Sequence, residues 1–261
     1  MKITTPNSYK DLLIRKLQGL VWRLENTGNG DFKKNGELSF IQDVGKHFSG
    51  KSFVAFDIGA NVGEYTDMIL KYVPAQNIEL HLFEPQKTCF DTITTKFSDN
   101  QKIHLNSFGL SDTQHDTLIY KDFDQSGLAS VHKRNLAHYD MEMDKTENIS
   151  LQKASEYLKG SQVAKINLIK IDIEGHELAA LSGFGDFLSP RNVDLIQFEY
   201  GGANLDSHTS LLDLFTFFEA KGFSVCKMMK TGLEIQSYKP RFENFMYQNW
   251  VAVAPQFIKS D

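Results

Sequence analysis

Three ionisable side chains lie within five residues of one another, directly after a hydrophobic stretch. Asp172, Glu174 and His176 follow Leu168-Ile-Lys-Ile, which is typical of a buried strand. Histidine titrates near neutral pH and can accept a proton from a hydroxyl group, with Glu174 or Glu199 orienting its ring. The carboxylates of Asp172, Glu174 and Glu199 would also suit a divalent metal that lowers the pKa of a bound hydroxyl. The pattern therefore predicts Asp172, Glu174 and His176 as catalytic residues, with either a histidine base or a metal.

A glycine turn precedes this group in the chain and indicates a bound cofactor. The segment from Phe53 is typical of a strand, a turn and a helix, and the next strand ends on Glu84. That order is typical of a nucleotide-type cofactor site. Glu84 could accept hydrogen bonds from both hydroxyls of an adenosine ribose. The glycines would let the backbone approach the ligand, and the cofactor-binding residues expected in the turn are Asp57, Gly59, Ala60, Asn61 and Gly63.

The negative charge of Asp57 distinguishes between a dinucleotide and S-adenosylmethionine as the cofactor. A dinucleotide would place its pyrophosphate against the turn, where two like charges about 4 Å apart repel by roughly 4 kcal/mol at an effective dielectric constant of about 20. S-adenosylmethionine carries no phosphate, and its sulfonium and ammonium groups would be attracted by an acid. Ala60 also interrupts the G-x-G-x-x-G pattern of dinucleotide sites. The turn therefore favours S-adenosylmethionine over the nicotinamide cofactor of a dehydrogenase.

Strand-like and helix-like segments alternate from Ser52 onward, which predicts an α/β fold. Strands are expected at Phe53–Ile58, Ile78–Glu84, Ile103–Phe108, Asn167–Ile173, Val193–Tyr200, Phe223–Met229 and Trp250–Val253. Helices are expected at Glu64–Tyr72, Lys87–Phe97, His176–Gly183 and Ser210–Lys221. The alternation indicates a mostly parallel sheet with helices on both faces, an antiparallel closing strand and a hairpin at Thr231-Gly232. Residues 51–261 are thus expected to form one domain.

Two further segments lie outside this pattern. Residues 1–50 are expected to form a helical extension and a linker, and a helix from Tyr9 would place a stripe of leucines on one side, at Leu13, Leu17, Leu20 and Leu24. We expect this stripe to pack on the domain or on a second subunit of a homodimer, with a basic membrane-surface helix as the alternative. The polar stretch at 122–148 is expected to be an acceptor loop or lid, or else a disordered loop.

Composition restricts the partners and the compartment. A net charge of −5 and a pI near 5.9 argue against nucleic acid as the main partner. The two cysteines, Cys89 and Cys226, have no metal-ligand spacing and favour a reducing cytoplasm. Met1–Pro6 contains no apolar leader segment, and no run of about eighteen uncharged apolar residues occurs. A soluble cytoplasmic protein without a transmembrane segment is therefore expected.

The motifs together resemble those of the FkbM family of methyltransferases. The resemblance spans roughly Phe53 to Pro255, and the residues that carry it are Asp57-Ile-Gly-Ala-Asn-Val-Gly-Glu-Tyr, Phe83-Glu-Pro, Gly109-Leu-Ser-Asp, Ile171-Asp-Ile-Glu-Gly-His-Glu and Phe198-Glu-Tyr-Gly. It implies a Rossmann-like class I methyltransferase sheet of seven strands, one of them antiparallel. It also implies transfer of a methyl group from S-adenosylmethionine to a hydroxyl of a sugar, glycoconjugate or secondary metabolite.

The resemblance also implies a place for each part of the cofactor. The turn from Asp57 to Gly63 would hold the methionine part, Glu84 the ribose, and Ser111 with Asp112 the adenine. The acceptor would be selected outside these motifs, by the first fifty residues and the loop at 122–148.

Two other functions stay open at this point. His132-Lys-Arg134 would suit a methyltransferase that acts on nitrogen in RNA or protein, although the acidic pI weighs against it. The same fold could also serve a non-catalytic module that binds a cofactor or a partner.

Overall fold

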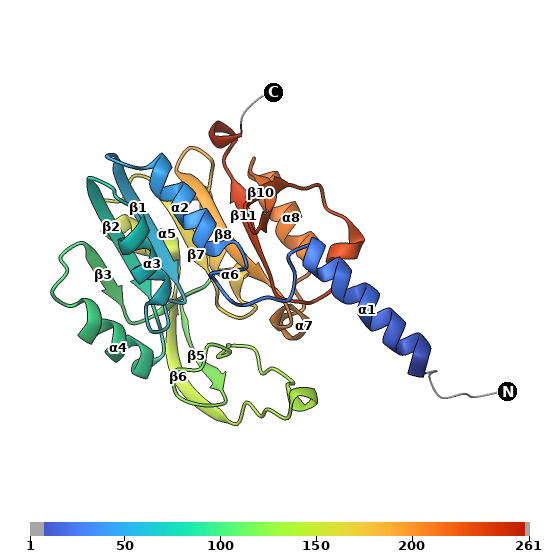
Figure 1. The fold of residues 1–261 in the computed structure, drawn as a ribbon. Helices are drawn as coiled ribbons and strands as arrows, with labels where there is room; N and C mark the ends of the chain where they lie inside the picture. The colour runs from blue at the N-terminus through green and yellow to red at the C-terminus, as the bar shows by residue number, and fades with distance from the viewer. Residues whose placement is uncertain (1–7, 259–261) are drawn as a thin grey trace.

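An eight-stranded sheet forms the centre of the computed structural model, which describes residues 8–258 (Figure 1). The pairs within β8-β7-β1-β2-β3 are parallel. By contrast, β11 is antiparallel to β8 and β9, and β10 is antiparallel to β9. From one edge to the other the strands are β10 (Gly232–Ile235), β9 (Ser224–Met229), β11 (Gln248–Val253), β8 (Val193–Tyr200), β7 (Ile166–Ile171), β1 (Ser52–Ile58), β2 (Asn77–Phe83) and β3 (Ile103–Asn106).

The register of the central strands brings their carboxyl ends to one edge of the sheet. Ile58 of β1 lies opposite Phe83 of β2 on one side and opposite Ile171 of β7 on the other. The glycine turn, Glu84 and Asp172 directly follow these three residues. Ligands of open α/β sheets bind outside the carboxyl ends of the strands, so this edge is where a site is expected.

Helices cover both faces of the sheet. Side chains on β1 alternate between two hydrophobic clusters, with Phe53 and Ala55 in one and Phe56 and Ile58 in the other. The cluster of Phe53 includes residues of α2 (Glu37–His47), α3 (Glu64–Tyr72) and α4 (Lys87–Phe97). The cluster of Phe56 includes residues of α5 (Ala154–Gly160), α6 (Glu177–Ser182) and α8 (Leu211–Ala220), and the short α7 (Ala203–Ser207) precedes α8.

The expected α/β architecture is confirmed, with additions. The seven predicted strands are present, and the predicted hairpin is found where Met229 of β9 pairs with Gly232, which begins the eighth strand, β10. Helix α2 was not predicted from the sequence. It follows Gly36, whose φ of 103° is left-handed, and its buried face holds only a few apolar residues, among them Phe40, Ile41 and Val44.

A small second sheet also differs from the sequence-based expectation. It contains β4 (Gly109–Leu110), β6 (Lys145–Gln152) and β5 (His115–Lys121), in that order. Most side chains of β5 and β6 are polar, so the hydrophobic alternation that marks a strand is weak there. Residues 145–148, expected in the polar loop, belong to β6, and the loop itself covers 122–144 (Figure 1).

Helix α1 (Ser8–Leu24) projects away from the sheet (Figure 1). The expectation that its leucine stripe packs on the chain's own domain is wrong, because no residue of α1 is buried and Leu17 is 55% exposed. Packing on a second subunit stays a prediction. The expected lack of a leader at Met1–Pro6 concerns residues outside those described. Among residues 8–258, no helix is both long and apolar enough to cross a membrane.

Candidate functional site

A cavity of about 700 Å³ lies at the carboxyl ends of β1, β2 and β7. Its volume is in the range of small-molecule and cofactor sites. Glu84, Asp172, Glu174 and His176, which the sequence placed at one site, all line it. Of the five cofactor-binding residues predicted in the glycine turn, three line it as well, namely Gly59, Ala60 and Asn61.

Glu84 is buried at the end of β2, and backbone groups hold its carboxylate in place. Its Oε2 accepts a hydrogen bond from the backbone N–H of Asn61 (2.8 Å), and its Oε1 accepts one from that of Gln86 (2.8 Å). A carboxylate offers about four acceptor positions, so both oxygens can still accept a hydrogen bond from a ligand. Burial raises the pKa of Glu84 to about 7.

The glycines of the turn are required by packing as well as by conformation. Gly59 has a φ of 79°, and a β-carbon there would lie 2.1 Å from the carbonyl oxygen of Asp172. Gly63 has a φ of 77°, and a β-carbon there would lie 2.5 Å from the ring of Phe97. Gly63 does not line the cavity. Close contacts between chain segments therefore explain these glycines, and ligand approach is not needed to account for them.

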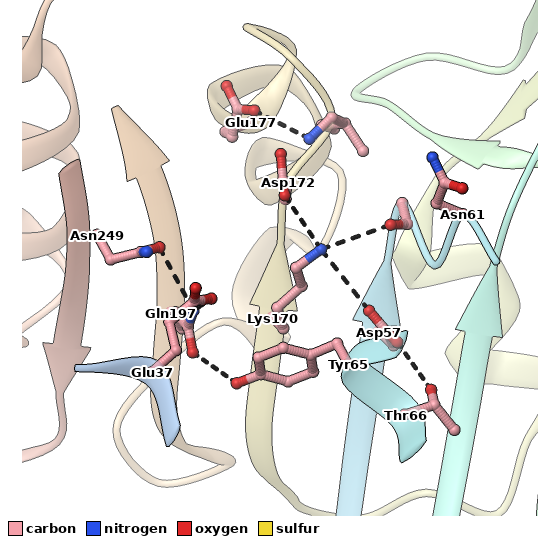
Figure 2. A network of polar contacts seen from close by, with 12 residues as sticks. Glu37, Asp57, Asn61, Tyr65, Thr66, Lys170, Asp172, Glu177, Gln197 and Asn249 are labelled. Atoms are coloured by element: carbon pink, nitrogen blue, oxygen red, sulfur yellow. Dashed lines mark hydrogen bonds and ion pairs between the residues drawn. The ribbon is translucent and has the colours of Figure 1, made fainter. Parts of the chain in front are cut away.

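Asp57 lies beneath the turn and forms an ion pair instead of lining the cavity (Figure 2). Its Oδ2 accepts a hydrogen bond from Thr66 (2.7 Å), and its Oδ1 lies 4.0 Å from Nζ of Lys170. The ammonium of Lys170 also lies 3.3 Å from Oδ2 of Asp172 and donates to the carbonyl oxygen of Gly59 (3.5 Å). Direct contact of Asp57 with a cofactor stays a prediction, and Lys170, which lines the cavity, joins the turn to Asp172.

Lys170 was missed in the sequence-based site, although a signal for it existed. It is a charged residue in an otherwise hydrophobic strand, and buried lysines are rare unless they are paired. Burial lowers the pKa of Lys170, but Asp172 and Asp57 outweigh this effect, so its pKa lies above the ordinary value. The side chain is therefore a permanent cation between two acids. On its other side, the ring of Tyr65 lies 5.6 Å from the ammonium.

Tyr65 connects this part of the site to two further elements (Figure 2). Its hydroxyl donates to Oε1 of Gln197 on β8 (2.5 Å), and Nε2 of Gln197 donates to Glu37 of α2 (2.8 Å). Glu37 itself lines the cavity, as do residues of the segment before it. The first fifty residues thus contribute to the cavity wall, and their part in selecting the acceptor stays a prediction.

Three carboxylates gather beyond the end of β7. Ligand oxygens of Asp172, Glu174 and Glu199 all lie within 4.8 Å of one another. Two of the acids already have cationic partners, because Nη1 of Arg134 lies 2.6 Å from Oε2 of Glu174 and Lys170 pairs with Asp172. Burial and the charge of Asp172 raise the pKa of Glu174 to about 8, and burial raises that of Glu199 well above its usual range.

The ion pair of Arg134 argues against the segment His132-Lys-Arg134 as an RNA-binding site. The sequence marked His132-Lys-Arg134 as possible support for RNA binding, but the side chain of Arg134 is only 8% exposed. It points inward to Glu174 and lies 3.7 Å from Asp206. A buried, paired arginine does not present its charge to a phosphate backbone.

His176 directly precedes α6 and contacts Ser111. Its Nε2 lies 3.0 Å from the Ser111 hydroxyl, which itself donates to Asp112 (3.1 Å). Because the Ser111 hydroxyl proton is donated to Asp112, the hydroxyl oxygen can only accept a hydrogen bond from His176. Nε2 of His176 therefore carries the ring proton, and Nδ1 keeps its lone pair. Burial and the neighbouring His132 lower the pKa of His176 to about 4, so the ring is neutral at pH 7.

This contact corrects the expected orientation of His176. Ser111, rather than Glu174 or Glu199, holds the ring in the structure. Ser111 and Asp112 do not line the cavity, so their contact with adenine stays a prediction. The polar loop does line it, through Ser126, Gly127, Ala129 and Val131.

The acidic turn is held by short contacts from two sides. Glu174 has a φ of 53°, which is uncommon for a residue with a side chain. The Ser130 hydroxyl donates to the carbonyl oxygen of Glu174 (2.7 Å), and Oε1 of Glu177 accepts from the backbone N–H groups of Ile173 and Gly175 (3.1 Å each). Ser130 thus attaches the polar loop to the acidic turn.

The doubly wound sheet with its inserted antiparallel β11, together with a cavity at the strand ends, defines a Rossmann-like methyltransferase domain. The family model of the methyltransferase FkbM domain matches residues 57–225, which is more than half of the chain. The protein therefore belongs to the FkbM methyltransferase family.

Two relatives are informative. The hexuronic acid methyltransferase AglP of Haloferax volcanii is 27% identical over 153 residues, which is 57% of this chain and 56% of that protein. The match thus spans little more than half of that relative. The crystal structure of the methyltransferase FkbM from Methylobacillus flagellatus KT has a TM-score of 0.50 at 14% identity, and covers 92% of this chain and 58% of the other. At that identity the similarity shows the fold alone.

Proposed function

We propose that the protein is an S-adenosylmethionine-dependent O-methyltransferase that methylates a hydroxyl of a sugar or glycoconjugate. The observation that carries this proposal is that Glu84 and His176 line one cavity. Glu84 would bind the ribose, and His176 would take the proton of the acceptor. A non-catalytic binding module would not require a neutral histidine with a free lone pair at that position.

The residues around the turn fit the cofactor. Both oxygens of Glu84 keep acceptor capacity for the ribose hydroxyls, while their bonds to the backbone fix the carboxylate beforehand. Asp57 and Asp172 beside the turn share the single cation of Lys170, and this excess of acid favours a cationic ligand over a pyrophosphate. When bound, S-adenosylmethionine would supply an electrophilic methyl group on a sulfonium that departs as a neutral thioether.

His176 would accept the proton that the acceptor hydroxyl loses. As the new oxygen–carbon bond forms, this proton becomes strongly acidic, so a base with a pKa of about 4 is sufficient. Nδ1 of His176 is buried and has no hydrogen-bond partner among residues 8–258. That nitrogen keeps its lone pair, whereas Nε2 is occupied by Ser111.

A sugar acceptor is supported by the relative that acts on hexuronic acid. The cavity also has room beside the cofactor turn, with walls from Lys33 and Phe32 of the amino-terminal segment, Ser126 of the polar loop and Tyr247. Aromatic faces and polar groups together suit a carbohydrate ring. The polar loop would thus act as an acceptor loop.

The first experiment is calorimetric titration of S-adenosylhomocysteine into the wild type and Glu84→Gln. We expect binding by the wild type and binding at least about tenfold weaker in the variant, since hydrogen bonds to a charged group are lost. Asp91→Asn, an exposed acid on α4 outside the cavity, is the matched control. Preference for NAD, or no binding by the wild type, would overturn the proposal.

The acceptor is then identified by transfer of a labelled methyl group to neutral sugars, hexuronic acids, RNA and protein. A product stable to mild alkali is a methyl ether and supports transfer to a hydroxyl. An alkali-labile product is a methyl ester and would move the reaction to a carboxylate. Label in RNA or protein would instead establish nitrogen methylation, and no transfer to any acceptor would favour a binding module.

We further propose that the protein works as a homodimer in the reducing cytoplasm. The exposed stripe of α1 supports a dimer, because covering it would remove apolar surface from water. A monomeric mass in light scattering would exclude this. The free, buried thiols of Cys89 and Cys226 support the compartment. Localisation of a tagged full-length chain tests it.

A further inference from the structure

A second cluster of metal-ligand side chains lies between β2 and β3, apart from the site described above. Glu79 and His81 are on β2, and His104 is on β3. They line a cavity of about 490 Å³ together with residues of α5. None of the residues that line this cavity lines the larger one. The cluster is therefore a separate site, and methyl transfer gives no explanation for it.

The sheet itself brings the three side chains together. His81 and His104 are register partners in the parallel pair β2–β3. Glu79 precedes His81 by two residues and so points to the same face. The imidazole rings are nearly parallel, with centroids 4.5 Å apart and planes 13° apart, so the half-exposed ring of His104 must turn for both Nε2 lone pairs to meet one ion. Because strands and not loops carry these residues, their spacing is defined before any ligand binds.

Two of the three ligand–ligand distances already lie close to the spacing that a zinc ion requires, and all three ligand atoms lie within 4.8 Å of one another. Nε2 of His81 and Nε2 of His104 each lie 3.1 Å from the same oxygen of Glu79, Oε1. In a tetrahedral site with bonds of about 2.0–2.1 Å, ligand atoms lie roughly 3.3–3.4 Å apart. Both nitrogen–oxygen distances are thus within a few tenths of an ångström of the coordinated geometry.

An outer partner orients the inner histidine. The hydroxyl oxygen of Tyr157 lies 2.6 Å from Nδ1 of His81, and Asn106 donates to that oxygen (3.5 Å). Zinc-bound histidines typically give their second ring N–H to such an acceptor, which fixes the tautomer and the ring plane. With Nδ1 bonded to Tyr157, Nε2 of His81 is left for the metal.

Exposure leaves a route for an ion and a place for water. His81 is buried at 2% exposure, whereas Glu79 and His104 are 45% and 47% exposed. An ion can therefore enter from solvent, and its fourth position faces water. Three protein ligands with one open position are typical of zinc sites that keep a bound water.

We propose that Glu79, His81 and His104 bind one zinc ion, with water as the fourth ligand. Two histidines and a glutamate are a known type of zinc ligand set. β3 is at the edge of the large sheet and pairs there with β2 alone, so the ion ties the edge strand to the sheet. This inference does not depend on the proposed methyl transfer.

The test is titration of Zn²⁺ into the metal-free full-length protein, measured by calorimetry and repeated with Co²⁺ as a spectroscopic probe. We expect one ion per chain and the intense visible absorption of tetrahedral Co²⁺. His104→Ala and Glu79→Gln change half-exposed residues and should weaken zinc binding at least tenfold. Tyr157→Phe keeps the ring and should weaken it about tenfold.

Two controls make the result decisive. His138→Ala removes an exposed histidine of the polar loop and should leave zinc binding unchanged. Glu174→Gln alters the acidic cluster beside the larger cavity and should also leave it unchanged. Absence of zinc binding in the wild type, or equal affinity in His104→Ala, would overturn the proposal. Loss of binding in Glu174→Gln alone would assign the ion to the acidic cluster instead.

Discussion

The Ser111 hydroxyl accepts a hydrogen bond from His176, and this contact decides which ring nitrogen is left for chemistry. The Nε2–Oγ distance is 3.0 Å, while Nδ1 is buried with no partner within the described part of the chain. A buried polar atom without a partner costs free energy unless a ligand completes it. The contact therefore leaves Nδ1 of His176 as the nitrogen that would accept the proton in the proposed reaction.

We expect His176→Asn to lower kcat by about 10²–10⁴-fold, the usual contribution of a general base. Binding of S-adenosylhomocysteine should stay unchanged, because Glu84 and the turn are intact. Single-turnover rates and calorimetry measure the two quantities. Ser111→Ala should reduce kcat less, since the histidine remains but its ring is no longer held. Full activity of His176→Asn would refute a base at this position.

Removal of metal should leave methyl transfer unaffected. Asp172 and Glu174 are already paired with Lys170 and Arg134, so the acidic cluster is partly neutralised without an ion. Initial rates before and after treatment with EDTA test this. EDTA would also remove an ion held by His104, so His104→Ala is assayed in parallel. A loss of activity that this variant does not reproduce would indicate a metal at the acidic cluster.

Cofactor binding should strengthen as pH rises through about 7. Burial raises the pKa of Glu84 to about 7, so the carboxyl is mostly protonated at pH 6 and mostly ionised at pH 8. Ribose hydroxyls donate to the ionised form, which links binding to loss of the proton. Affinity for S-adenosylhomocysteine should therefore rise roughly tenfold over this range, as the ionised fraction does. Glu84→Gln should show no comparable rise in calorimetry.

Breaking the ion pair of Arg134 should destabilise the protein strongly. The Arg134 and Glu174 side chains are 8% and 12% exposed, and above pH 8, where Glu174 is ionised, Arg134→Met would leave a buried carboxylate without its partner. We expect a loss of about 3–5 kcal/mol in the free energy of unfolding, measured with urea. The double variant with Glu174→Gln should recover part of the loss, because the unpaired charge is gone. Additive losses would show that the two residues are not coupled.

Alanine substitutions at Gly59 and Gly50 distinguish the cost of a left-handed backbone from the cost of a steric clash. Gly59 and Gly50 both have positive φ, at 79° and 69°, but a β-carbon on Gly50 would meet nothing within 4 Å. Gly50→Ala should therefore cost only about 1–2 kcal/mol of unfolding free energy, from the left-handed conformation. Gly59→Ala should cost about 1–3 kcal/mol more, because the new carbon meets the carbonyl of Asp172. Equal losses in urea unfolding would exclude this conflict.

Local sequence patterns were sufficient to predict the main strands and helices of the large sheet. The predicted strand at Val193–Tyr200 and the helices at Glu64–Tyr72 and Lys87–Phe97 are found with those bounds, because their apolar residues follow the strand or helix period strongly. Helix α2 and strands β5 and β6 escaped prediction. Polar residues interrupt the hydrophobic periodicity of these three elements, and tertiary contacts determine their structure.

In the candidate site, too, some features could be predicted from the sequence and others could not. The positions of Glu84, Asp172, Glu174 and His176 at one cavity could be predicted, since each follows a strand whose carboxyl end faces the same edge. Of the two cationic partners, Lys170 could have been predicted, because it is a charge in a hydrophobic strand two residues before Asp172. Arg134 could not, because it lies 40 residues before Glu174 and only the folded chain brings the two together.

The sequence by itself therefore determined the fold class, the family and the edge of the sheet that holds the cavity, because these depend on periodicity and on short motifs next to strand ends. Tertiary structure alone decided that Ser111 orients His176, that Lys170 neutralises Asp57, and that His81 meets His104. Such pairings depend on strand register and on segments distant along the chain, neither of which a local pattern specifies.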